Sequence, residues 1–98
     1  MIKGISENEQ KIVRSILAKF SDNYDFYYYG SRVKGGFSKV SDLDILIKGE
    51  KPFPTEDLEQ IKTAFDDSDL PYVANLTDFH NIETDFFNLI KNSLVSVF

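Results

Sequence analysis

The stretch from Tyr29 to Ile47 carries the side chains with the clearest chemistry, in the sequence YGSRVKGGFSKVSDLDILI. Gly30 and Ser31 form a turn whose backbone N–H groups are free to face an anion, and such amides make a phosphate site. Arg32 and two nearby lysines make the following loop cationic, although the chain as a whole is acidic. The turn and the loop together predict a cradle for phosphate groups.

Asp42 and Asp44 lie two positions apart at the mouth of an apolar strand, so their side chains point to the same face. Two adjacent carboxylates repel each other unless a cation lies between them. Mg²⁺ takes one or two carboxylates together with substrate phosphate oxygens. Either half of the pattern alone is typical of an ordinary hairpin. The two halves together, with Ser41 directly before the first aspartate, favour a metal and nucleotide site on one hairpin.

These residues resemble the signature of the polymerase β-type nucleotidyltransferase superfamily, a Gly-Ser loop followed by [ST]DxD. The GSRxxG spacing and the short chain are similar to the minimal nucleotidyltransferases, the MNT domains encoded beside HEPN-domain toxins. The resemblance implies that Gly30 and Ser31 bind the triphosphate and that Arg32 neutralises developing charge. It also implies that Ser41 contributes to the nucleotide site, and that Asp42 and Asp44 hold one or two Mg²⁺ ions with ATP as substrate.

A weaker resemblance continues through the segment PYVANLTDF, where the family has a third catalytic aspartate. Asn75 occupies that position here. An amide oxygen can contact Mg²⁺, but an amide carries no charge and is no base at neutral pH. Asp78 is a poor substitute, because three positions along a strand it points to the opposite face. A one-residue misalignment, a naturally weakened enzyme and an introduced change all remain open as explanations.

Composition narrows the function classes. Ninety-eight residues suit one domain, 1–98, with one modest core. Sixteen acidic against eleven basic residues, a net charge of −5, argue against a general nucleic-acid binder. The absence of cysteine excludes disulfides and thiolate metal sites. No apolar run reaches the length of a signal peptide core or a membrane span, which predicts a cytoplasmic protein that binds no membrane.

Periodicity predicts a mixed α/β order. A capping box of Ser6 and Glu9 opens a helix that runs to about residue 20. Further helices are expected over 55–65 and 83–91, and strands over 24–29, 42–48 and 71–77. The tyrosines of the first strand are interpreted as packing residues and His80 as exposed. The apolar tail, 93–98, either docks on the domain or meets a partner.

We therefore expect a polymerase β-like nucleotidyltransferase fold: a small mixed sheet, helices on one side, and the loop 30–41 at its edge. The expected reaction transfers AMP from ATP to a tyrosine of a HEPN-domain toxin, which makes the chain an antitoxin. Homo-oligomers and hetero-oligomers with the toxin both stay open. The alternative is an inactive module that neutralises its partner by occlusion. A small-molecule transferase of the aminoglycoside type is disfavoured, because no second domain closes over the substrate.

Overall fold

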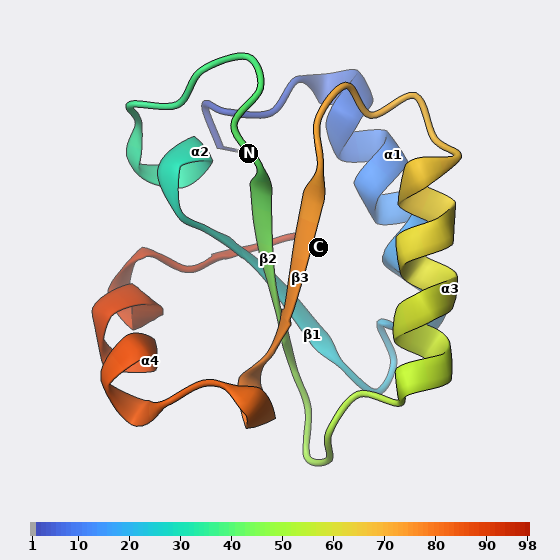
Figure 1. The fold of residues 1–98 in the computed structure, drawn as a ribbon, viewed down its shortest axis with the longest axis vertical. Helices are drawn as coiled ribbons and strands as arrows, with labels where there is room; N and C mark the ends of the chain where they lie inside the picture. Colours follow the sequence, from blue (N-terminus) through green and yellow to red (C-terminus); the bar gives the residue numbers. More distant parts are fainter. Residues whose placement is uncertain (1) are drawn as a thin grey trace.

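The computed structural model describes residues 2–98, and in that range helices surround a four-stranded sheet (Figure 1). The α-helices are α1 (Glu7–Leu17), α2 (Ser31–Lys34), α3 (Thr55–Asp66) and α4 (Thr84–Ile90). The strands are β1 (Asp25–Tyr29), β2 (Leu43–Lys48), β3 (Ala74–Asp78) and β4 (Val95–Ser96). Short 3₁₀ turns cover Ala18–Phe20, Phe79–Asn81 and Lys91–Ser93. Among these described helices, none has the length and apolar character needed to cross a bilayer.

The strands lie in the order β3-β2-β1-β4, and the pairing is mixed as expected. β1 and β2 are antiparallel, with Tyr29 opposite Asp44, whereas β2 and β3 are parallel, with Asp44 opposite Asn75. A parallel pair needs a long crossover, and α3 provides it. In the order β3-β2-β1-β4, the two inner strands are β1 and β2. The loop 30–41 that joins them therefore leaves the middle of the sheet rather than its edge. The local pattern could not show this, because β4 pairs with β1 from the far end of the chain.

One face of the sheet packs against α1 and α3, which lie side by side in Figure 1. The helix α1 begins at the predicted capping box: the Glu9 amide donates to the Ser6 hydroxyl, and the Ser6 amide donates to the Glu9 carboxylate. Its apolar stripe buries Val13 and Leu17 against the strands. The core on this face also contains strand residues and side chains of α3, namely Phe26, Tyr28, Leu43, Ile45, Ile47, Ile61 and Phe65.

The opposite face is covered by α4, which differs from the expectation of helices on one side only. Leu46 is fully buried there, and it forms a second cluster with Tyr29 and Ile90. The reason is visible in β2, whose consecutive apolar residues point alternately to the two faces and need cover on both. The same alternation places Asp44 on the α4 side of the sheet, because it shares a face with Leu46.

The apolar tail docks on the domain, which is one of its two expected placements. β4 pairs with β1, Tyr28 opposite Val95, and Val97 is completely buried. Gln10 Nε2 and Arg14 Nε of α1 both donate to the Val97 carbonyl oxygen, at 3.2 and 2.7 Å. The tail thus closes the β1 edge and holds α1 against it.

Candidate active site

The turn after β1 has the backbone that the Gly-Ser pattern predicts. Gly30 adopts φ +85° and ψ −158°, a region that is essentially restricted to glycine. Its carbonyl oxygen accepts hydrogen bonds from the amides of Val33 and Lys34, which closes the single turn of α2. The amides of Ser31 and Arg32 come before that closure, and amides at the first positions of a helix have no carbonyl partner within it. The turn therefore leaves two N–H groups for an anion.

Gly30 also lies directly against Asp44. A Cβ atom built on Gly30 would fall 2.3 Å from Asp44 Oδ2, well inside any real contact distance. The backbone conformation therefore favours glycine at this position, and any other side chain would also displace the Asp44 carboxylate. This close approach joins the two halves of the sequence pattern, the phosphate turn and the acidic strand, into one site.

Asp44 is half-buried, and its surroundings oppose ionisation. Burial raises the pKa of Asp44 above the ordinary value, the hydrogen bond from Asn75 lowers it, and the nearby charge of Asp42 raises it again. Asp42 precedes β2 and is exposed. The repulsion between the two carboxylates is the electrostatic reason why this pair suits a cation.

Asn75 completes this group from β3. It lies opposite Asp44 in the parallel register, and Nδ2 of Asn75 is 3.5 Å from Oδ1 of Asp44. Two carboxylates and one amide form a set of oxygen donors that fits Mg²⁺. Within residues 2–98, no three His, Cys, Asp or Glu side chains gather as a metal site. The amide at position 75 accounts for this at the candidate site.

Tyr29 and Thr77 extend the same face of the sheet beside Asp44. The Tyr29 hydroxyl is 3.1 Å from Thr77 Oγ1, so the ring reaches across β2 to β3. Burial raises the pKa of Tyr29, and the negative charge of Asp44 raises it further. Phe86 of α4 packs edge-on against the Tyr29 ring, with 6.0 Å between ring centroids. Sequence reasoning missed Thr77 and Phe86 as neighbours of the site, because only the strand register and the position of α4 bring them there.

Arg32 does not occupy the position that the sequence suggested. Its side chain is buried, with 4% of its surface exposed, and the guanidinium donates to four backbone carbonyl oxygens rather than facing the turn. Ser41 is also engaged within the loop, where its hydroxyl accepts a hydrogen bond from the Ser38 amide at 2.9 Å. The expectation that Arg32 neutralises phosphate charge is therefore corrected: its donors are committed to the protein backbone.

Asp78 lies outside the candidate site. It shares a strand face with Ala74 and Leu76, the face that packs on the α1–α3 side. Its carboxylate accepts hydrogen bonds from the amides of Phe53, at 2.7 Å, and His80, at 3.0 Å. The predicted opposite orientation of Asp78 is thus confirmed.

His80 is exposed, as expected, and its Nε2 atom lies 2.8 Å from the Gly49 carbonyl oxygen.

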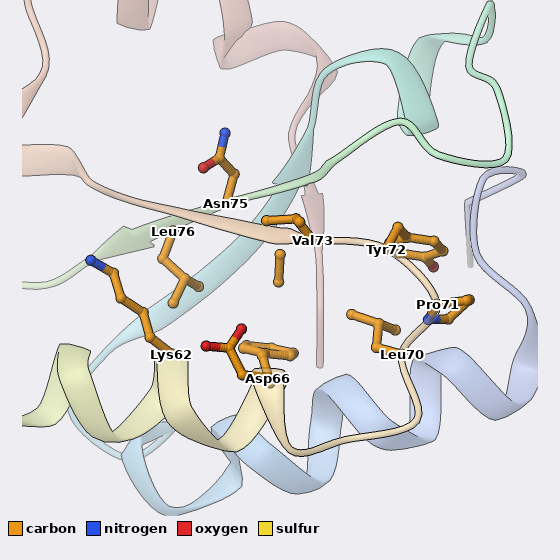
Figure 2. A pocket seen from close by; sticks show the side chains of 10 residues that line it. Lys62, Asp66, Leu70, Pro71, Tyr72, Val73, Asn75 and Leu76 are labelled. Carbon is orange, nitrogen blue, oxygen red and sulfur yellow. The ribbon is translucent and has the colours of Figure 1, made fainter.

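A hollow of ≈ 550 Å³ runs along the free edge of β3, between this strand and α3 (Figure 2). Figure 2 shows the Leu76 side chain turned toward α3 and the Asn75 side chain turned to the other side of the strand. The hollow lies on the α3 side of β3 and does not include Asp44, although Asn75 is one of its lining residues. The candidate site, with Asp44 and Asn75, lies on the α4 side of the sheet beside the Gly30 turn.

Comparisons with known proteins identify the family of this chain. A family model described as "Nucleotidyltransferase domain" matches residues 9–94, a range that includes Gly30, Asp44 and Asn75. The chain is also similar to a protein of Haemophilus influenzae named "Probable protein adenylyltransferase MntA". The two are 37% identical over 93 residues, which cover 95% of this chain and 82% of the relative.

Proposed function

This chain belongs to the nucleotidyltransferase domain family and is a nucleotidyltransferase, and on that premise we propose a specific reaction for it. It transfers AMP from ATP to a tyrosine hydroxyl of a HEPN-domain toxin in the cytoplasm, and this modification makes it the antitoxin of a pair. The observation that carries the proposal is the convergence of the Gly30 turn and Asn75 on Asp44. The name of the relative, a probable protein adenylyltransferase, favours a protein acceptor.

In the proposed reaction the turn binds phosphate groups and the two aspartates bind the metal. The amides of Ser31 and Arg32 and the Ser31 hydroxyl bind the outer phosphates of ATP, and Gly30 lets those phosphates approach Asp44 closely. Asp42 and Asp44, with the Asn75 amide oxygen, would hold Mg²⁺. When bound there, Mg²⁺ neutralises phosphate charge and so favours in-line displacement. Position 32 takes part through its backbone, because its guanidinium is engaged elsewhere.

The transfer itself forms one bond and breaks one. The tyrosine oxygen attacks the α-phosphorus of ATP, the bond from that phosphorus to the pyrophosphate oxygen breaks, and the hydroxyl proton leaves. A carboxylate at position 75 would accept that proton, but Asn75 cannot do so at neutral pH. Water is left to take it, so we expect slow turnover.

Incubation with [α-³²P]ATP, Mg²⁺ and a candidate HEPN-domain partner tests the proposal. We expect label on one tyrosine of that protein, located by mass spectrometry, and none when this tyrosine is changed to phenylalanine. Asp44→Asn should abolish labelling without unfolding the chain. Labelling that persists in Asp44→Asn would refute the assignment of the site.

A second candidate is favoured by one observation, the neutral amide of Asn75 beside Asp44. In this case the fold neutralises its partner by binding and covering the partner's active site, and nucleotide transfer is vestigial. The two candidates differ in the effect of Asp44→Asn on toxin neutralisation in cells. Loss of neutralisation supports transfer, whereas full neutralisation with an intact complex supports occlusion.

A further inference from the structure

We propose that Arg32 is a positioning residue, which holds the segment carrying Asp42 against the strand carrying Asp44 and so sets the spacing of the two metal-binding carboxylates. The inference rests on the proposed function for its metal, but its contacts belong to the chain itself. It also changes the meaning of the arginine in the Gly-Ser-Arg pattern, from a phosphate ligand to a clamp on the loop that leads to Asp42.

The guanidinium gathers three carbonyl oxygens of one loop. Nε donates to Ser41 at 2.9 Å, and Nη2 donates to Ser38 at 3.3 Å and to Lys39 at 3.1 Å. Ser41 is the residue directly before Asp42, so the clamp acts one peptide bond away from a candidate metal ligand. A planar fork with five donors can satisfy several carbonyls at once, whereas a lysine ammonium has three donors on one atom.

Arg32 also connects this loop to the segment that leads into β3. The plane of its guanidinium stacks on the Tyr72 ring, with 3.5 Å from Cζ to the ring centroid. The Tyr72 hydroxyl donates to Glu9 at 2.8 Å, and the next residue, Val73, accepts from the Leu43 amide at 2.8 Å. The aromatic stack is worth more in this buried position than on the surface. The Arg32 side chain thus contacts both the segment before Asp42 and the segment before Asn75.

The N-terminal segment provides the fourth carbonyl oxygen that binds the guanidinium. Arg32 Nη1 donates to the Gly4 carbonyl at 2.6 Å, and the Gly4 amide donates to the Arg32 carbonyl at 3.0 Å. A Cβ atom on Gly4 would lie 2.4 Å from Arg32 Cβ and 2.5 Å from its carbonyl oxygen, and the latter, like the Cα atom at 2.6 Å, is backbone. A side chain at position 4 must therefore displace Arg32. This allows the position of Arg32 to be changed while its charge is kept.

The experiment measures loop order and metal binding in the absence of nucleotide, so a phosphate contact cannot contribute. Hydrogen–deuterium exchange follows the segment 38–42, and Mn²⁺ affinity, read by electron paramagnetic resonance, stands for Mg²⁺. The variants are Arg32→Lys, which keeps the charge but loses the fork, and Gly4→Ala, which keeps Arg32 but displaces it. Lys3→Gln is the matched control, since it changes the exposed neighbour of Gly4 and leaves the clamp intact.

We expect Arg32→Lys and Gly4→Ala each to weaken Mn²⁺ binding roughly tenfold, the scale seen when groups that orient metal ligands are removed. Exchange should accelerate in the segment 38–42 while α1, α3 and the strands stay protected, and Lys3→Gln should behave as the unmodified chain. If Gly4→Ala does not fold, Arg32→Lys alone decides.

Wild-type exchange and Mn²⁺ affinity in a folded Arg32→Lys would overturn the proposal, and so would acceleration spread evenly over the whole chain. If the unmodified chain binds Mn²⁺ neither alone nor in the presence of ATP, the proposed function fails. The exchange measurement then decides the loop clamp by itself.

Discussion

Asn75 and Asp44 face each other across the parallel β2–β3 pair, and the amide nitrogen of Asn75 lies 3.5 Å from a carboxylate oxygen of Asp44. A carboxylate at position 75 would repel Asp44, whereas the amide donates a hydrogen bond to it. The chain therefore gains a satisfied contact in the metal-free state. It loses the negative charge and the base that a carboxylate at position 75 would provide.

Changing Asn75→Asp should raise the rate of AMP transfer. General-base catalysis contributes roughly 10² to 10⁴ in rate, and the new carboxylate would lie beside Asp44 in the proposed site. The measurement is transfer of labelled AMP to the proposed HEPN-domain partner. Asn75→Ala is the control, because it removes the same hydrogen bond without supplying a base. A gain shared by both variants would mean that the base is not the cause.

ATP binding should require Mg²⁺, because Asp42 and Asp44 repel a triphosphate when no cation is present. Calorimetric titration of ATP with and without Mg²⁺, on the unmodified chain and on Asp42→Ala/Asp44→Ala, measures this. We expect Mg²⁺ to increase the ATP affinity of the unmodified chain strongly and to have no effect on the ATP affinity of Asp42→Ala/Asp44→Ala. Equal affinity under all four conditions is the result that excludes the proposed metal site.

Gly30→Ala should lose more function than its backbone strain explains. Gly30 and Gly35 share the same glycine-only region of backbone conformation, which costs a non-glycine residue roughly 1–3 kcal/mol. A Cβ atom at Gly35 meets nothing within 4 Å, whereas at Gly30 it meets Asp44 at 2.3 Å. Gly35→Ala is the matched control. Urea unfolding should show a lower free energy of unfolding for both variants, and calorimetry should show a larger loss of Mg²⁺–ATP affinity for Gly30→Ala than for Gly35→Ala. Equal losses of Mg²⁺–ATP affinity in the two variants would show that the close approach of Gly30 to Asp44 does not contribute to binding.

Asp78→Ala should destabilise the chain without removing transfer activity. Its carboxylate accepts two backbone hydrogen bonds, and losing bonds to a charged group costs roughly 1–3 kcal/mol. Urea unfolding measures the stability, and labelled AMP transfer at a temperature where the variant is folded measures the activity. A folded variant without activity would make Asp78 the base, against its orientation on the α1–α3 face.

The sequence alone determined most of the local elements, although β3 begins at Ala74 rather than at residue 71 and Ser31–Lys34 of the expected loop forms α2. The capping box, the period of the helices and the apolar run of β2 depend on neighbouring residues, so they could be predicted without knowledge of the fold. The two aspartates and the Gly-Ser turn are also local, because Asp42 and Asp44 are separated by one residue at the start of β2. The amide at position 75 was identified by resemblance to a segment of the family.

Only the tertiary structure decided which distant residues meet. The central place of the β1–β2 hairpin depends on the tail pairing with β1, and the cover of the second face depends on α4 packing on Leu46. The role of Arg32 depends on Gly4 and Tyr72, which are remote in sequence and approach it only after the sheet has formed. No spacing rule encodes such contacts, because burial and backbone hydrogen bonding across the whole fold determine where a buried guanidinium finds its acceptors.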